Sequence, residues 1–187
     1  MANENPHLIW IDCEMTGLSL EKDALVEIAV LVTDSELNPI GEGADVVIKT
    51  TQEKLDQMSE FVKNMHTESG LLPQISNGAS MEEAESKVLT YLQSTGIKPG
   101  TAPLAGNSIS MDKNFIARDM PNLDAFLHYR IVDVSSLKEL AKRWYPEIYF
   151  KAPAKTGNHR AMGDVLDSIE ELRYYRANIF TKTQAPQ

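Results

Sequence analysis

The stretch IWIDCEMTG, residues 9–17, begins as an apolar strand and then places two carboxylates two residues apart. Residues 8–13 are apolar on both faces, which is typical of a central strand covered by helices on two sides. Because strand side chains alternate, Trp10, Asp12 and Glu14 share one face. Two anions at the end of a buried face are costly unless a cation neutralises them. The stretch therefore suggests a divalent metal site, beside the plainer interpretation that the strand has ended and both acids are solvated.

The pattern of the whole chain predicts an α/β domain with a mixed sheet flanked by helices on both sides. We expect strands at 8–13, 24–34, 44–50, 102–107 and 128–134. We expect helices up to residue 67 and at 81–94, 111–119, 137–145 and 160–180, with loops at 69–80 and 146–158. Ser80 with Glu83, and Ser136 with Glu139, have the spacing of capping boxes. No break in composition divides the chain, so we expect one domain over residues 1–187 with an ordered core near 7–180.

Composition favours a soluble intracellular protein. The 187 residues are 42% hydrophobic and 24% charged, which is ordinary for a globular domain. A single cysteine, Cys13, allows no intramolecular disulfide. No apolar run approaches the roughly 20 residues that span a bilayer, and the first residues lack secretory or transit features. We expect a cytoplasmic protein without a membrane partner; no import signal is visible, and a mitochondrial pool from another start site stays open.

The net charge of −9 limits the class of nucleic acid that the protein can bind. Proteins that bind long strands or duplexes usually neutralise many phosphates with Lys and Arg. We therefore expect no long duplex partner, whereas a substrate with one or two phosphates remains compatible with the charge.

Two further acids and one histidine extend the metal hypothesis. Asp112 shares a helix face with Phe115 and Ile116, and Asp164 lies beside the apolar stripe of the last helix. Each also has a plainer interpretation as a first-turn or capping acid. His159, at the mouth of the last helix, suits a general base near pH 7 or is simply a surface histidine. Four carboxylates and one histidine form a set suited to phosphodiester hydrolysis by two metal ions roughly 3.5–4 Å apart.

The ordered motifs resemble those of the DEDD exonucleases, in the branch that carries a histidine in the last motif. The matching segments are DCE at 12–14, GNSISMDKNF with Asp112, and HRAMGD with His159 and Asp164. Nearly the whole chain is similar to the oligoribonuclease family, through IWIDCEMTGL, LAGNSI, LHYRIVDVSSLKELAKRWYPE and SIEELRYYRANIF.

That resemblance implies an RNase H-like fold, a homodimer and a 3′→5′ exoribonuclease. The enzyme would cut dinucleotides and other very short RNAs to nucleoside 5′-monophosphates with two Mg²⁺ or Mn²⁺ ions, completing RNA degradation. His159 would deprotonate the attacking water. The implied metal ligands are Asp12, Glu14, Asp112 and Asp164.

The resemblance also implies a set of substrate contacts. Leu18 would wedge between bases, and His66 would reach the substrate. Tyr129, supplied by the partner subunit, would stack on a base. A hydroxyl and guanidinium cap would bind the 5′-phosphate. The full set is Met15, Gly17, Leu18, Phe61, His66, Ser108, Tyr129, Arg130, Ser135 and Ser136. Simple loop packing for Leu18, and ordinary strand or interface roles for Tyr129 and Arg130, remain open.

Three positions depart from the family pattern. Phe61 replaces a usual Trp, Ser136 replaces a usual Thr and keeps the hydroxyl, and Gly163 replaces an Asp just before Asp164. None of these removes a catalytic group, so we expect an active enzyme. The alternatives are a DNA-directed 3′→5′ exonuclease, a silent nucleic-acid-binding or scaffold protein, and a nucleotide-binding phosphatase.

Overall fold

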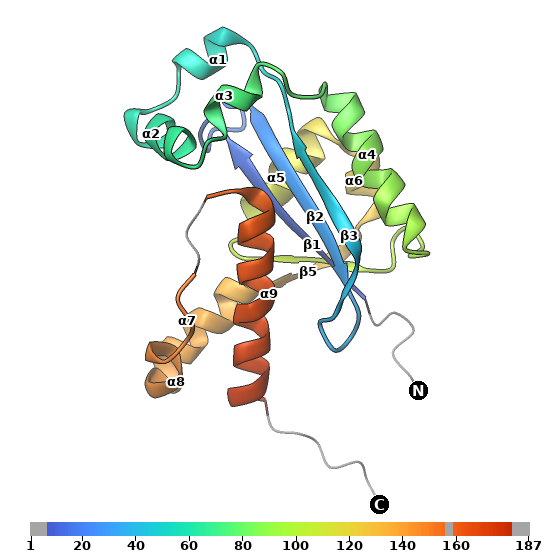
Figure 1. Cartoon of the computed structure of the whole chain (residues 1–187). Coiled ribbons are helices and arrows are strands. Elements are labelled where there is room, and N and C mark those ends of the chain that lie inside the picture. The colour runs from blue at the N-terminus through green and yellow to red at the C-terminus, as the bar shows by residue number, and fades with distance from the viewer. Residues whose placement is uncertain (1–6, 156–158, 181–187) are drawn as a thin grey trace, which may run out of the picture.

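The computed structural model describes residues 7–155 and 159–180, and it places a mixed sheet between two layers of helices (Figure 1). The sheet has the order β3-β2-β1-β4-β5. The pairs β3–β2 and β2–β1 are antiparallel, and the pairs β1–β4 and β4–β5 are parallel. The strands are β1 Leu8–Met15, β2 Leu25–Thr33, β3 Pro39–Val47, β4 Pro103–Gly106 and β5 His128–Asp133. The prediction of a mixed α/β sheet is confirmed.

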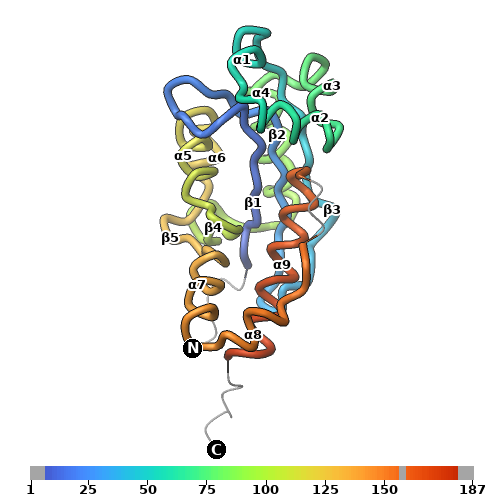
Figure 2. The backbone as a smooth tube through the Cα atoms, turned by 90° about the vertical axis from the view of Figure 1, so that its left-hand side faces the viewer, coloured from blue at the N-terminus to red at the C-terminus, as the bar shows by residue number. Residues whose placement is uncertain are grey.

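Alternation along β1 places a different core on each face of the sheet. Ile9, Ile11 and Cys13 belong to a cluster with Val88 and Phe115. Trp10 belongs to a second cluster on the other face, together with residues of α9. Figure 2 shows α5 and α6 on one side of β1 and α9 on the other. Helices therefore flank both faces, as the sequence predicted.

Within the described residues, more helices form than expected, and several of them are short. They are α1 Gln52–Asp56, α2 Glu60–Glu68, α3 Leu72–Ile75, α4 Met81–Ser94, α5 Ser110–Asp119, α6 Pro121–Phe126, α7 Val134–Trp144, α8 Pro146–Phe150 and α9 Ala161–Asn178. The capping box of Ser80 and Glu83 at the start of α4 is confirmed. None of these helices is both long enough and apolar enough to cross a membrane.

Several predicted boundaries are wrong, and the reasons are physical. The expected loops contain α3 and α8, and α6 was missed; each has a proline in its first turn, where the ring pre-sets the helical φ. Strand β3 starts at Pro39 because pairing with β2 extends it, and it ends at Val47. Asp133, rather than Ser136, caps α7: its side chain accepts a hydrogen bond from the Ser135 backbone N–H. The last part of the predicted loop 146–158, including Gly157 and Asn158, lies outside the described residues.

Candidate active site

Three carboxylates converge where β1 meets the first turn of α9. Asp12 and Glu14 come from β1, and Asp164 comes from α9. One oxygen from each lies within 4.8 Å of the others. Glu14 is buried, whereas Asp12 and Asp164 are partly accessible. The predicted convergence of these three acids is confirmed, and we call them the carboxylate cluster.

Asp112 approaches the carboxylate cluster from the opposite side of β1. It is buried in the first turn of α5, and its Oδ1 accepts a hydrogen bond of 2.9 Å from the Cys13 backbone N–H. Its charge is close enough to raise the pKa of both Asp12 and Glu14. Asp112 lies outside the group of three whose oxygens meet within 4.8 Å, so its role as a fourth ligand stays a prediction.

Burial and mutual repulsion favour the protonated forms of these acids. Burial is the largest cause that raises the pKa of Asp12 well above its usual value, followed by the charges of Asp112 and Asp164. Burial raises the pKa of Glu14 to about 8 and that of Asp112 to about 7. The pKa of Asp164 is also raised by burial. A divalent cation would relieve both the desolvation and the repulsion, and it would find oxygen ligands of the kind that Mg²⁺ and Mn²⁺ prefer.

A second observation agrees with a cation at this position. His66 Nδ1 is buried, has no hydrogen-bond partner, and lies 3.9 Å from Glu14 Oε2. Its other nitrogen, Nε2, lies 2.9 Å from the Met15 carbonyl oxygen and must donate to it. The unpaired nitrogen is therefore directed at the carboxylate cluster, where a polar ligand or water would satisfy it. The donor set and this atom both fit a bound divalent ion.

Two predicted substrate contacts have buried side chains in this structure, and their contact with the substrate stays a prediction. His66 is 0% exposed, because it packs beneath the end of β1 and bonds to Met15. The Met15 side chain is buried in the apolar cluster on the opposite face, as strand alternation requires. Both side chains are therefore packed in the interior next to the carboxylate cluster.

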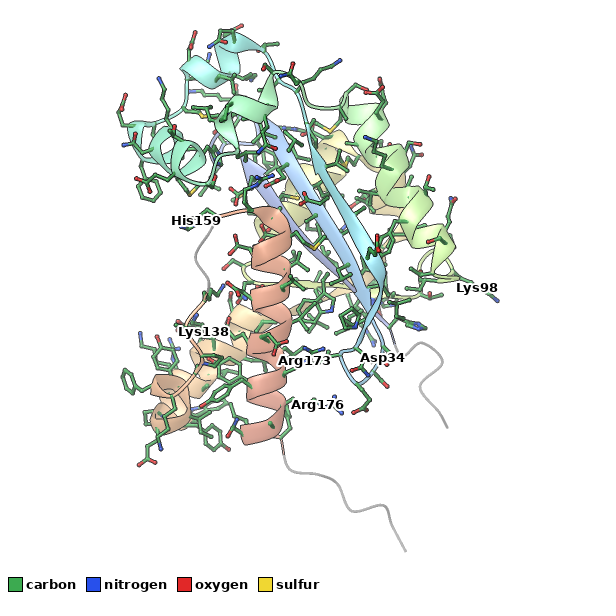
Figure 3. All side chains as sticks on the ribbon, viewed as in Figure 1. Asp34, Lys98, Lys138, His159, Arg173 and Arg176 are labelled. Carbon is green, nitrogen blue, oxygen red and sulfur yellow. The ribbon has the colours of Figure 1, made fainter. Side chains whose placement is uncertain are left out.

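His159 lies on the segment that enters α9 (Figure 3). Its side chain is exposed, and its φ of 48° falls in the left-handed region, which is uncommon for residues other than glycine. Its charge lowers the pKa of Asp164, after the larger effect of Lys155 and against the effect of burial. His159 is thus exposed at the entry to α9 and close enough to Asp164 for its charge to affect that carboxyl group, and its role as a proton acceptor stays a prediction.

The loop after β1 presents Leu18 to solvent. Gly17 is required there, because a Cβ at this position would lie 2.5 Å from Asp23 Oδ2. Asp23 closes the loop by accepting hydrogen bonds from the Ser19 backbone N–H at 2.8 Å and the Thr16 hydroxyl at 3.2 Å. Leu18 is consequently 68% exposed, and Phe61 on α2 is 76% exposed. Both apolar side chains are available to contact bases.

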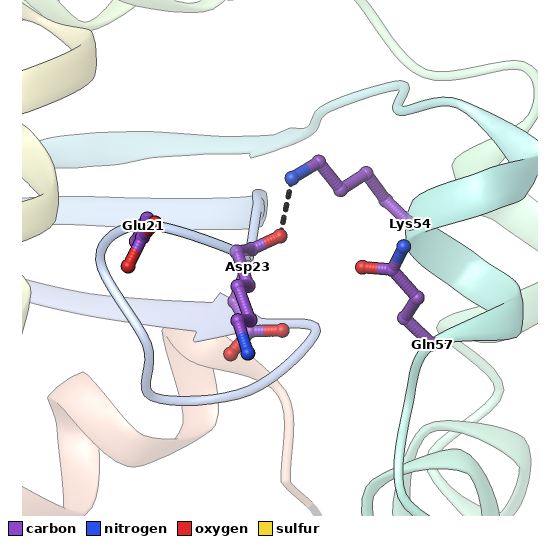
Figure 4. Close-up of a pocket in the computed structure, with 5 residues that line it drawn as sticks. Glu21, Asp23, Lys54 and Gln57 are labelled. Carbon is purple, nitrogen blue, oxygen red and sulfur yellow. Dashed lines mark hydrogen bonds between the residues drawn. The ribbon is translucent and has the colours of Figure 1, made fainter.

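A hollow beside this loop is separate from the carboxylate cluster. It lies between residues 21–23 and α1 (Figure 4). Lys54 from α1 donates a hydrogen bond to the Lys22 carbonyl oxygen across it. Its other lining residues are Glu21, Asp23 and Gln57, so its charges are of both signs. It carries none of the predicted site residues.

Two residues of the predicted phosphate cap, Ser108 and Ser135, meet at the carboxyl ends of β4 and β5. The Ser108 backbone N–H, held at φ 53°, donates to Ser135 Oγ at 2.8 Å and to Asp133 Oδ1 at 3.1 Å. The Ser135 hydroxyl donates to Asn107 Oδ1 at 3.0 Å. Because β1, β4 and β5 are parallel, their carboxyl ends share one edge of the sheet with the carboxylate cluster. Ligands of open α/β sheets usually bind at such an edge.

The remaining predicted contacts are accessible on β5 and at the start of α7. Tyr129 is 78% exposed, and the Arg130 guanidinium lies over its ring at 5.4 Å. Ser136 is exposed one residue beyond Ser135. Gly163 lies inside α9, which is continuous from Ala161.

Sequence reasoning missed the groups that hold the site together. Glu27 on β2 is 0% exposed and pairs with Arg160. Glu171 on α9 is buried and accepts a hydrogen bond of 3.1 Å from the Asn107 amide. Lys138 lies 3.2 Å from the same carboxylate. An acid inside an otherwise apolar strand was the available signal for Glu27, because such a charge needs a partner.

The comparisons with known proteins agree with this geometry. An exonuclease family model, RNase_T, matches residues 9–172. Oligoribonuclease from Streptomyces griseus is 57% identical over 182 residues, which cover 97% of this chain and 90% of that protein. Oligoribonuclease from Cutibacterium acnes is 52% identical over 180 residues, covering 96% and 89%.

Solved structures of exonuclease I share the fold. A zinc-bound complex of the Escherichia coli enzyme with single-stranded DNA has a TM-score of 0.70 at 17% identity, covering 94% of this chain and 41% of that one. Exonuclease I from Methylocaldum szegediense has a TM-score of 0.67 at 21% identity, covering 92% and 41%. This chain therefore spans less than half of either structure, and the likeness confirms the RNase H-like fold.

The chain belongs to the RNase_T exonuclease family, whose members are nucleases that hydrolyse phosphodiester bonds. Relatives that are 52–57% identical over nearly its full length are named oligoribonuclease, which confirms the closer resemblance seen in the motifs.

Proposed function

We propose that this protein is a 3′→5′ exoribonuclease that hydrolyses dinucleotides and other very short RNAs to nucleoside 5′-monophosphates. The observation that carries the proposal is the carboxylate cluster at the carboxyl end of β1, within a chain whose relatives are named oligoribonuclease. The net charge of −9 supports a short substrate, because few phosphates need few basic contacts. We place this activity in the cytoplasm, at the last step of RNA degradation.

The residues divide the chemistry between them. Two divalent cations, Mg²⁺ or Mn²⁺, would be held by Asp12, Glu14, Asp112 and Asp164, and when bound they supply charge stabilisation at the phosphoryl oxygens. His159 accepts the proton of the attacking water, which requires its neutral imidazole. The water oxygen bonds to phosphorus as the bond from phosphorus to the 3′ oxygen breaks. The 3′ oxygen takes a proton from solvent and leaves as a hydroxyl, and the phosphate stays esterified to the 5′ oxygen of the released nucleotide.

The accessible side chains around the cluster set the substrate length. Leu18 and Phe61 offer apolar surface for bases on one side. On the other side Ser108, Ser135 and Ser136 offer hydroxyls, and Arg130 offers a guanidinium suited to a terminal phosphate. A cap that binds the 5′-phosphate of the second nucleotide favours dinucleotides over longer strands.

The decisive assay compares substrate length and sugar. Purified protein is incubated with end-labelled RNA and DNA of two, three, five and twenty nucleotides, with Mg²⁺, Mn²⁺ or EDTA. We expect metal-dependent loss of the RNA dinucleotide and poor activity on the twenty-mer. Equal or faster degradation of the twenty-mer would refute the short-substrate proposal, and preference for DNA would favour a repair or proofreading exonuclease. His159→Ala should lose most turnover while the fold is retained.

We also propose that the protein acts as a homodimer. Strand β5 is at the edge of the sheet, and its Tyr129 and Ile131 are exposed. Trp144 at the end of α7 is 67% exposed, and Phe150 on α8 is 78% exposed. Exposed apolar side chains and an open strand edge of this kind suit contact with a second copy of the chain. Light scattering should give a dimer, and Trp144→Glu should weaken it; a fully active monomer would contradict the shared site.

A further inference from the structure

Glu27 is a buried acid that the proposed chemistry does not use. It lies on β2 among apolar residues, is 0% exposed, and stands directly opposite Glu14 in the antiparallel pair. A second carboxylate beside an acidic cluster adds repulsion and desolvation. Its charge indeed raises the pKa of Glu14, next after burial and Asp164. Such a residue needs a compensating role.

Both oxygens of Glu27 are committed to the start of α9. Oε1 accepts hydrogen bonds from Arg160 Nε at 2.9 Å and from Nη2 at 2.5 Å. Oε2 accepts a hydrogen bond of 3.0 Å from the Ala161 backbone N–H. The N-cap residue of α9, Arg160, makes no side-chain capping bond of its own. The cap of this helix is therefore supplied from β2, across the sheet face.

This contact fixes where the first turn of α9 lies. Ala161 is the first residue of the helix and Asp164 follows three residues later, on the same side. Glu27 is one strand away from Asp12 and Glu14, so it holds α9 at the level of those two acids. Because Glu27 binds both the Ala161 N–H and the Arg160 side chain, it restrains the position of α9 along its axis and its rotation about that axis.

We propose that Glu27, with Arg160, is the positioning residue that brings Asp164 into the carboxylate cluster and thereby sets its affinity for divalent cations. The proposal rests on the proposed metal-dependent function, but it concerns how the cation is bound and not which nucleic acid is cut.

Glu85 provides a matched control on the other face of the sheet. It lies on α4, is 9% exposed, and caps α6 from outside that helix. One of its oxygens accepts hydrogen bonds from the Asn122 N–H at 2.7 Å and the Leu123 N–H at 2.9 Å. Like Glu27, it is a buried carboxylate that accepts hydrogen bonds from the first backbone N–H groups of a helix, but that helix carries no member of the carboxylate cluster.

The test measures Mn²⁺ binding by electron paramagnetic resonance without any RNA, together with thermal unfolding. We expect Glu27→Gln to weaken Mn²⁺ binding by about tenfold or more, as the loss of groups that orient metal ligands commonly does. Glu85→Gln should lower the melting temperature while leaving Mn²⁺ affinity unchanged. Equal Mn²⁺ affinity of Glu27→Gln and wild type would reduce Glu27 to a stability residue and overturn the proposal.

Two further variants separate position from charge. Glu27→Gln also removes the negative charge beside Arg160, and this change in net charge would by itself weaken Mn²⁺ binding. The double variant Glu27→Gln with Arg160→Met restores the local net charge but not the hydrogen bonds that the two Glu27 oxygens accept. We therefore expect its Mn²⁺ binding to remain weak. Full recovery of affinity would show that charge, not position, was responsible. Arg160→Lys keeps the charge and loses the paired Nε and Nη2 donors to Glu27 Oε1, so we expect weaker Mn²⁺ binding, and it provides the same test if Glu27→Gln does not fold.

A last control keeps the two proposals apart. Asp12→Asn should abolish most Mn²⁺ binding, which shows that the resonance signal reports the carboxylate cluster. Retained binding in Asp12→Asn would refute the metal centre and the Glu27 proposal with it. Failure of wild type to degrade short RNA would refute the proposed substrate alone.

Discussion

The two faces of the sheet use the same strand for opposite purposes. Toward α4, α5 and α6, β1 presents Ile9, Ile11 and Cys13, and this face is apolar along its length. Toward α9 it presents Trp10 and then Asp12 and Glu14. The first face stabilises the fold by removing apolar surface from water. The second face lowers the free energy of unfolding of the metal-free protein, because its acids are buried and repel one another. Strand alternation separates stability from chemistry within one element.

The largest expected effect comes from the chemical face. Asp164→Ala removes one cluster ligand, so we expect turnover of an RNA dinucleotide to fall by at least about 100-fold, beyond what loss of a supporting group costs. The melting temperature in EDTA should stay equal or rise, because one repulsive carboxylate is gone. Steady-state kinetics and calorimetry measure the two quantities. Near-normal turnover would remove Asp164 from the site.

A substitution on the apolar face should show the reverse pattern. Ile9 is 0% exposed, and Ile9→Ala should lower the free energy of unfolding by about 2–5 kcal/mol. Turnover per folded molecule, measured well below the melting temperature, should be retained. Urea unfolding gives the first quantity. A large loss of turnover in a variant that stays folded would show that the two faces are coupled.

The metal-free protein should also show a pH dependence of its stability. The pKa of Glu14 rises from 4.5 to about 8 and that of Asp112 from 3.8 to about 7, so the folded state binds more protons than the unfolded state between these values. The free energy of unfolding should therefore fall as pH rises from about 5 to 8 in EDTA. Melting curves at several pH values measure this slope, and Mn²⁺ should restore stability most at pH 8. A rise in stability with pH in EDTA would contradict the burial of these acids.

Local pattern was sufficient for the strands and for the acids that they carry. The expected face of Asp12 and Glu14 followed from alternation, and the position of Asp164 followed from the apolar stripe of α9, because both depend only on neighbours in the chain. The short helices α6 and α8 were missed because tertiary contacts stabilise helices of this length more than their own propensity does. His66 was expected to reach the substrate; no local pattern indicated that its side chain is buried, with Nε2 bonded to the Met15 carbonyl oxygen and Nδ1 facing Glu14.

By itself, the sequence determined the sheet, the family and the acids, because strand alternation and ordered motifs can be read without knowing distant contacts. Only the tertiary structure decided which groups hold those acids in place. Glu27 and Arg160 are 133 residues apart, and no local pattern relates them. Their pairing exists because α9 crosses β2 at that point, where a buried carboxylate and an uncapped helix end satisfy each other.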